Sequence, residues 1–188
     1  MIRLAGAAAT AAAGAYLAWW AASAFGDGPL FALIASWLTV SVVAVVGQAL
    51  PFHLPAPFYE FRAFERSGAV YERLGVRLFK RVVRRGPLSV FSPTLRFPQQ
   101  PSLPASKQLE VEMRRAEAGH VVAFFLVCLA ALASAIVGWL ETAAWLALLN
   151  VPLNCYPVML QRYNRRKLHE RMLILTRGSE LASGSPTP

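Results

Sequence analysis

Long hydrophobic segments alternate with polar ones along the chain, and their lengths predict membrane-spanning helices. The segments are residues 4–25, 29–50, 121–140 and 142–160, and none of them contains Asp, Glu, Lys or Arg. A helix needs about 20 apolar residues to cross the hydrocarbon core of a bilayer. With 56% hydrophobic and 15% charged residues, the chain carries too much apolar surface for an ordinary soluble domain. We therefore expect an all-α membrane protein whose four transmembrane helices form two hairpins.

The basic residues indicate how these helices are oriented. The 19 Lys and Arg lie at Arg3, in residues 51–117 and in residues 161–188, whereas the short turns between the spans carry only Asp27 and Glu141. Lys and Arg accumulate in loops on the cytoplasmic side of a membrane. Because four spans put all these basic segments on one side, we expect a multi-pass protein of the bacterial inner (cell) membrane with both termini in the cytoplasm.

The first hydrophobic segment has a second interpretation. It is rich in Ala, follows Arg3 and contains the small residues Ala21-Ala22-Ser23-Ala24, as a cleaved signal peptide would. The next span would still enter the cytoplasm, so residues 51–117 have the same location in both interpretations.

Charge and cysteine content bear on the partners of the chain. The net charge of +9 is explained by membrane topology and by attraction to anionic membrane lipids, so we expect no nucleic acid partner. Cys128 and Cys155 both fall inside predicted spans, where they pack as small apolar residues. The chain has 3 histidines and no recognised pair of metal ligands, so we expect no metal site.

The basic cytoplasmic loop is expected to contain an amphipathic helix over residues 64–85. Apolar residues recur there every four positions, at Val70, Leu74, Leu78 and Val82, and arginines fill the other faces. Such a helix either lies on the lipid headgroups or packs against the protein's own spans. Both interpretations stay open at this point.

Prolines punctuate the segment that follows. Residues 86–104 contain prolines at intervals that exclude a regular helix, so we expect a proline-rich loop before helix resumes near Ser106. The predicted organisation is an N-terminal transmembrane hairpin (1–50), the basic cytoplasmic loop (51–117), a transmembrane hairpin with the candidate active site (118–165) and a cytoplasmic tail, disordered at its end (166–188).

A first group of candidate functional residues lies at the entry of the third span, where Glu112, Glu117 and His120 occur. Residues three apart, such as Glu117 and His120, lie on one side of a helix. A carboxylate there would orient the imidazole and stabilise its charged form. With an ordinary histidine pKa of about 6.5, His120 can act as a general base toward a hydroxyl group. The alternative is a structural histidine that hydrogen-bonds across helices.

A second polar group lies at the exit of the fourth span. Asn154 falls inside that span, where an amide is costly without a partner. Directly outside the span follow Gln161, Arg162, Tyr163, Asn164 and Arg165. Their donors suit sugar hydroxyls, carboxylates or phosphates. The alternative is ordinary basic flanking with an aromatic anchor, although anchoring requires neither Gln nor Asn. Because the last two spans are expected to be antiparallel neighbours, we expect both groups to share one pocket at the cytoplasmic face.

At these residues the chain resembles the glycosyl-4,4'-diaponeurosporenoate acyltransferase family, small membrane enzymes that complete the carotenoid staphyloxanthin. The resemblance covers Arg-Ala-Glu117-x-x-His120 with Glu112 upstream, and then Asn154 followed seven residues later by Gln-Arg-Tyr-Asn-Arg. It extends more loosely to the aromatic and basic region from Tyr59 to Gly86.

The resemblance implies transfer of a fatty acyl group to a sugar hydroxyl of a glycosylated carotenoid or related glycolipid. It implies no cofactor apart from an acyl donor, such as acyl-CoA or another acyl carrier. In the mechanism that follows, His120 deprotonates the hydroxyl, Glu117 orients His120, and Gln161, Arg162 or Asn164 stabilises the oxyanion or positions the sugar. The expected substrate-binding residues are Glu112, Asn154, Gln161, Arg162, Tyr163, Asn164 and Arg165.

Other classes of function remain open. A non-catalytic membrane scaffold that recruits lipid or pigment biosynthesis enzymes through its basic loop predicts that His120→Ala leaves function intact. An intramembrane metal-dependent hydrolase is weaker, because only His53, His120 and His169 are available as histidine ligands.

Overall fold

The structure is a computed structural model that describes residues 2–65, 67–85 and 102–183, with side chains as far as residue 177. Within these ranges every regular element is a helix and no strand occurs, which confirms the all-α class. The helices are α1 (Ile2–Phe25), α2 (Pro29–Ala49), α3 (Ala56–Tyr59), the 3-10 turn η1 (Ala63–Glu65), α4 (Ala69–Arg73), α5 (Val76–Arg85), α6 (Leu103–Ile136), α7 (Leu140–Asn150), the π-helical turn η4 (Val151–Cys155) and α8 (Tyr156–Ser183).

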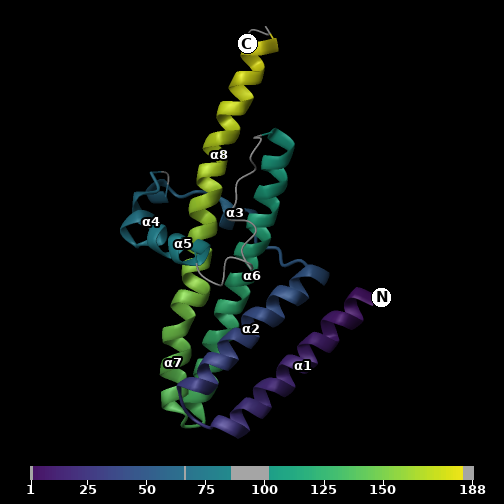
Figure 1. The fold of residues 1–188 in the computed structure, drawn as a ribbon, viewed down its shortest axis with the longest axis vertical. Helices are drawn as coiled ribbons and strands as arrows, with labels where there is room; N and C mark the ends of the chain where they lie inside the picture. Colours follow the sequence, from purple (N-terminus) through teal and green to yellow (C-terminus); the bar gives the residue numbers. More distant parts are fainter. Residues whose placement is uncertain (1, 66, 86–101, 184–188) are drawn as a thin grey trace. The chain divides into compact units, whose positions relative to one another are not determined.

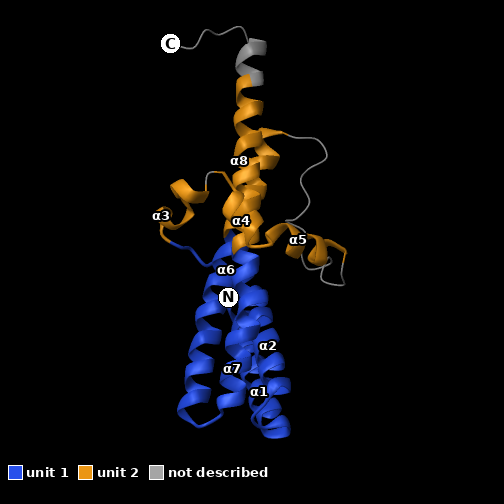
Figure 2. Cartoon of the chain, turned by 90° about the vertical axis from the view of Figure 1, so that its left-hand side faces the viewer, with its two compact units in different colours: residues 1–54, 115–158 blue, residues 55–114, 159–188 orange. Residues whose placement is uncertain are grey.

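The chain divides into two compact units, shown in blue and orange in Figure 2. Unit 1 comprises residues 1–54 and 115–158, and unit 2 comprises residues 55–114 and 159–188. The long helices α6 and α8 each begin in one unit and end in the other. Each unit therefore joins segments that are far apart in the sequence. The predicted organisation into residues 1–50, 51–117, 118–165 and 166–188 concerns the arrangement in the membrane, and it stays a prediction.

Short glycine turns connect the helices of unit 1. The chain reverses between α1 and α2 (Figure 1), where Gly26 and Gly28 have φ values of 63° and 154°, which other residues rarely adopt. The hydroxyl of Thr142, on α7, accepts a hydrogen bond of 2.9 Å from Gly28 N, and Thr142 N donates one of 2.8 Å to Asp27 Oδ1. These bonds tie the first turn to the start of α7. The helices then pack through Ala32, Val127 and Leu146, which are almost fully buried.

Three helical stretches are long and apolar enough to cross a membrane: Pro29–Ala49, Leu103–Ile136 and the continuous stretch Leu140–Arg177. Large apolar side chains on α6 are exposed, as a bilayer solvent would require, at Phe125, Leu129, Leu132 and Ile136. The segment α1 is not one of the three. The four-span count therefore stays a prediction, as does the layout of two transmembrane hairpins. Glu141, expected in the turn itself, lies in the first turn of α7.

Unit 2 is built around the first part of α6 and the second part of α8. Leu109 and Met113 on α6 pack against Leu168 on α8, and all three are buried. Pro104 falls in the first turn of α6, where a missing N–H costs no intrahelical hydrogen bond, so the helix begins at Leu103, slightly earlier than expected. The preceding residues 86–101 of the predicted proline-rich loop lie outside the described part of the chain, as do residues 184–188 of the tail.

The prediction of one amphipathic helix over residues 64–85 is wrong. The segment forms the short helices η1, α4 and α5 instead, and Gly68 and Gly75 separate them with φ values of 71° and 77°. Glycine adopts this left-handed conformation without steric cost and ends helices there. Gly68 also lies close to α8, since a Cβ on it would be 2.8 Å from Arg166 Nε. The chain therefore turns twice and folds onto α8 before α5 begins.

Candidate active site

A chain of hydrogen bonds in unit 1 links His120, on α6, to the end of α7 and the turn η4. His120 Nδ1 lies 3.3 Å from Asn154 Oδ1. Asn154 Nδ2 donates a hydrogen bond of 2.8 Å to Asn150 Oδ1. Asn150 Nδ2 in turn donates one of 3.1 Å to the backbone carbonyl of Phe124 and one of 3.4 Å to Cys128 Sγ. Both asparagines are buried, so apolar surroundings exclude water from the chain of bonds.

The direction of these hydrogen bonds fixes the position of the proton on His120. The carbonyl of Phe124 can only accept, so the amide nitrogen of Asn150 faces it and its oxygen faces Asn154. Asn154 must then donate to Asn150 and present its own oxygen to His120. That oxygen can only accept, so a neutral imidazole that donates to Asn154 carries its proton on Nδ1 and its lone pair on Nε2. The imidazole also interacts with the backbone of Leu153.

The π-helical turn η4 explains how Asn154 comes to face His120. Pro152 lies in the first positions of this turn and provides no N–H for the regular ladder of hydrogen bonds. The wider turn places Asn154 with no exposed surface. Turns of this kind inside helices occur frequently at functional sites. Pro157 lies in the first turn of α8.

Both acidic residues singled out from the sequence lie on α6, but in different units. Glu117 is fully buried in unit 1, one helical turn before His120. Glu112 is exposed in unit 2, where its carboxylate accepts a hydrogen bond of 3.4 Å from Gln108. The role of Glu117 in orienting His120 stays a prediction, and the hydrogen-bond acceptor at Nδ1 is Asn154.

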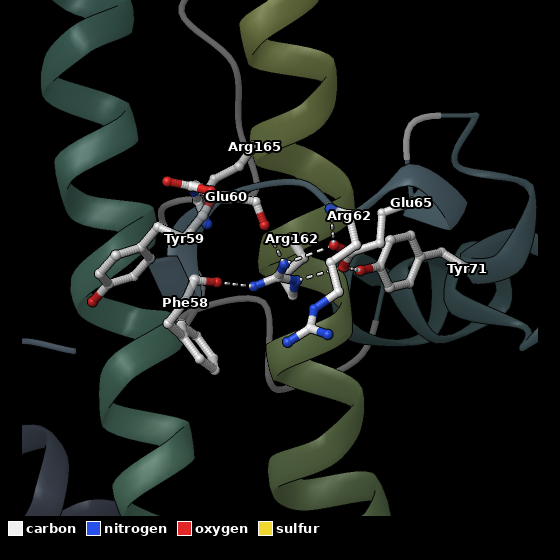
Figure 3. A network of polar contacts seen from close by, with 8 residues as sticks. All are labelled: Phe58, Tyr59, Glu60, Arg62, Glu65, Tyr71, Arg162 and Arg165. Atoms are coloured by element: carbon white, nitrogen blue, oxygen red, sulfur yellow. Dashed lines mark hydrogen bonds and ion pairs between the residues drawn. The ribbon is translucent and has the colours of Figure 1, made fainter. Parts of the chain in front are cut away.

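The second polar group packs in unit 2 against the segment that precedes α4, as Figure 3 shows for Arg162. Arg162 Nε and Nη2 donate hydrogen bonds of 2.7 and 2.8 Å to the two carboxylate oxygens of Glu65. Its Nη1 donates one of 2.7 Å to the carbonyl of Phe58, and Nη2 donates one of 3.0 Å to that of Glu60. Arg162 thereby holds the segment in place at several points.

Glu65 is buried and receives hydrogen bonds from several directions. Besides Arg162, the hydroxyl of Tyr71 donates to its Oε1 and the backbone N–H of Arg62 donates to its Oε2 at 2.8 Å. Burial raises the pKa of the Glu65 carboxyl, but these hydrogen bonds outweigh burial and lower the pKa to about 2. Burial, followed by the bond to Glu65, raises the pKa of Tyr71. Glu65 therefore stays ionised in the folded protein near neutral pH.

The other residues of Gln161–Arg165 are also buried, and three of them contact different parts of unit 2. Arg165 donates a hydrogen bond of 2.7 Å to the carbonyl of Tyr59 and lies over that ring at 5.2 Å. Tyr163 donates one of 2.9 Å to Glu72 and accepts one of 3.2 Å from Arg77. Asn164 Oδ1 accepts one of 2.7 Å from Lys80 Nζ on α5. The motif is thus an anchoring strip for residues 58–80.

The model of the family described as glycosyl-4,4'-diaponeurosporenoate acyltransferase matches residues 55–173 of the chain. This range covers more than half of the sequence and includes every candidate residue of both units. The chain belongs to this family. Searches of curated proteins and of solved structures gave no match. The family's name is that of an acyltransferase acting on a glycosyl carotenoid acid, which agrees with the resemblance described above.

Within this member of the acyltransferase family, the structure brings together some of the predicted residues and adds others. It joins His120 to Asn154, and it groups Arg162 to Arg165 on one anchoring strip. Because the two groups belong to different units, their common pocket stays a prediction. The sequence interpretation missed Asn150, Glu65, Tyr71 and Lys80. Only Asn150 carried a usable signal, since it is a second amide four residues before Asn154 inside an apolar segment.

Both cysteines of this family member are free, Cys128 exposed and Cys155 half-buried. Within the described ranges no group of three or more His, Cys, Asp or Glu could hold a metal ion.

Proposed function

We propose that this protein is a membrane O-acyltransferase that esterifies a sugar hydroxyl of a glycosylated carotenoid, or of a related glycolipid, with a fatty acyl group. The family match supports this proposal, because the family's name gives the reaction type and a glycosyl carotenoid acid as acceptor. The apolar helices support it as well, because both the acceptor and the acyl chain are lipid-soluble. We place the protein in the bacterial inner membrane with both termini cytoplasmic, where an activated acyl donor is available.

The observation that carries the proposal is the directional chain from the Phe124 carbonyl to His120. It leaves the lone pair on Nε2, so this atom can accept the proton of a sugar hydroxyl as the oxygen attacks the acyl carbonyl. The bond between carbonyl carbon and carrier then breaks, and the imidazolium returns the proton to the leaving carrier. Asn154 holds the imidazole in this tautomer, and Glu117 stabilises its charged form.

The remaining candidate residues have proposed roles that the resemblance to the family implies, and for the two arginines the contacts in unit 2 add to them. Gln161 and Asn164 position the sugar or stabilise the oxyanion. Arg162 and Arg165 shape the surrounding segment, since their guanidinium groups hold Glu65 and the carbonyls of residues 58–60. Glu112 and Tyr163 complete the set of substrate contacts. The acyl donor is an acyl-CoA or another acyl carrier, and membrane lipids surround the site.

The proposal is tested by mass spectrometry of pigments and lipids from a deletion strain complemented with wild type, His120→Ala or His53→Ala. His53 is an exposed histidine and serves as the matched control. General base catalysis contributes about 10²- to 10⁴-fold, so His120→Ala is expected to accumulate the non-acylated glycoside while His53→Ala restores the ester. Full rescue by His120→Ala at wild-type protein level would reject the base and favour the membrane scaffold instead.

A further inference from the structure

Hydrogen bonds to α8 determine where α5 lies. Arg77 Nε donates one of 3.2 Å to the hydroxyl of Tyr163, and Lys80 Nζ donates one of 2.7 Å to Asn164 Oδ1. Both helices belong to unit 2 at this point, and α5 runs across the direction of α8 in both views (Figures 1 and 2). One side of α5 therefore contacts α8, and the opposite side is directed away from it.

The partners of α5 on α8 lie close to the predicted end of a membrane span. The fourth predicted span covers residues 142–160, and Tyr163 and Asn164 follow it directly within the helix α8. A helix rises by about 1.5 Å per residue, so these two partners lie roughly 5 Å beyond the end of the span. The headgroup region on each side of the hydrocarbon core is roughly 5–8 Å deep. With the span ending as predicted, α5 is therefore held at the level of the lipid headgroups.

Apolar and cationic side chains share the outer face of α5. Leu78 and Val82 have exposed fractions of 61% and 59%, and Arg81 and Arg85 are exposed as well. Successive residues are about 100° apart around a helix, so these four side chains fall within an arc of about 100°. Arg84 is also exposed, but it lies about 120° from Leu78 and outside this arc. Exposed apolar side chains with arginines beside them are the pattern of a helix that binds a bilayer surface.

The charge of α5 indicates which bilayer surface it fits. The helix carries five basic residues and no acidic one, and the ion pair between Arg77 and Glu72 offsets only one of these charges. Guanidinium groups match the oxygens of a phosphate group. In the proposed topology α5 faces the cytoplasmic leaflet, whose anionic lipids give it a negative surface potential. A nucleic acid would match the charge but not Leu78 and Val82, whereas an anionic bilayer matches both.

We propose that Leu78, Arg81, Val82 and Arg85 form a docking surface for anionic phospholipids of the cytoplasmic leaflet. Leu78 and Val82 insert between the headgroups, and Arg81 and Arg85 bind the lipid phosphates. The surface thereby concentrates anionic lipid beside unit 2. This inference needs the membrane location of the protein, but it does not depend on the acyl-transfer reaction.

The test measures which lipids lie beside α5 in the full-length protein. An apolar fluorophore is attached to Val82→Cys, in a chain with Cys128 and Cys155 replaced by Ala, and the protein is reconstituted in phosphatidylcholine vesicles. Phosphatidylglycerol or phosphatidylcholine, spin-labelled at the same acyl carbon, is added as the quencher. One arginine near an anionic surface favours an anionic lipid about fivefold, so phosphatidylglycerol should quench at least about fivefold more efficiently. This preference should disappear at about 1 M salt, which screens exposed charges.

Matched variants separate this docking surface from the general charge of the helix. Replacing both Arg81 and Arg85 by Gln should abolish the lipid preference, whereas Arg84→Gln, outside the arc, should preserve most of it. All three arginines are exposed, so none of these changes should alter the midpoint of thermal unfolding. The proposal is rejected if the two lipids quench equally, if Arg84→Gln loses the preference as completely as the double variant, or if neither lipid quenches. The last result would show that a protein partner or a second copy covers this face.

Discussion

Asn154 Oδ1 lies 3.3 Å from Nδ1 of His120, and the proposed mechanism uses the ring nitrogen that this contact leaves available. Asn154→Leu removes this acceptor and interrupts the chain to Asn150. We expect the rate constant kcat to fall about 100-fold, since the base is no longer held in one tautomer, while KM changes little. Steady-state kinetics of the purified variant checks this. Ser134→Ala, a buried polar position of α6 outside the chain, is the control, and an unchanged kcat in Asn154→Leu contradicts the positioning role.

Arg162 is expected to matter more for stability than for the chemical step. Arg162→Ala leaves the buried Glu65 carboxylate without its strongest partner, and loss of one member of a buried pair costs about 3–5 kcal/mol. The midpoint of thermal unfolding, followed by circular dichroism in detergent, should therefore fall by roughly 10 °C. Arg81→Ala, on the exposed surface of α5, should leave the midpoint almost unchanged. Equal midpoints for Arg162→Ala and wild type would show that the pair contributes nothing.

At the scale of the helices, three of the four apolar positions that the sequence singled out in residues 64–85 are exposed. Leu74, Leu78 and Val82 have exposed fractions of 49%, 61% and 59%, whereas Val76 and Val83 are buried. The periodicity therefore identified an outward face, not the face that packs within unit 2. Exposed leucine and valine beside arginines are typical of a helix at a lipid headgroup layer, which favours the first of the two interpretations.

This membrane contact can be measured with a fluorescent probe. A polarity-sensitive label on Leu78→Cys, in a chain with Cys128 and Cys155 replaced by Ala, should be quenched by lipids that carry a spin label on the acyl chain. The same label on Arg84→Cys, about 120° away around the helix, should not be quenched. Quenching at neither position would mean that α5 does not lie on the bilayer.

Local signals explain which elements could be predicted. Uninterrupted apolar stretches of spanning length located the long helices, because burial in lipid needs little beyond hydrophobicity and length. Residues 64–85 break into three short helices because Gly68 and Gly75 have left-handed conformations. Glycine permits this conformation but does not require it, so the sequence alone does not show where the helix breaks. The close approach of Gly68 to Arg166 selects that conformation, and it arises only after α8 has packed against the segment.

At the scale of the whole molecule, the partners of the candidate residues were the hardest feature to predict from the sequence. The pair Arg162 and Glu65 is separated by 97 positions, and nothing near either residue signals the other. Arg162 was therefore interpreted as a donor to substrate, although its observed partners are Glu65 and backbone carbonyls. The hydrogen-bonded amides that lead to His120 were easier to predict. Polar residues in an apolar helix require partners, and Asn150 is near Asn154 in the sequence.

The central claim is that this membrane protein transfers an acyl group with His120 as the base. The most direct measurement is the initial rate of ester formation by the purified protein in liposomes, with a glycosylated carotenoid acid as acceptor and an acyl-CoA as donor, followed by mass spectrometry. We predict that wild type and His53→Ala form the ester at equal rates and that His120→Ala is at least about 100-fold slower. Two results would contradict the account. One is ester formation by His120→Ala at the wild-type rate, and the other is the absence of ester formation by wild type with every acyl carrier supplied.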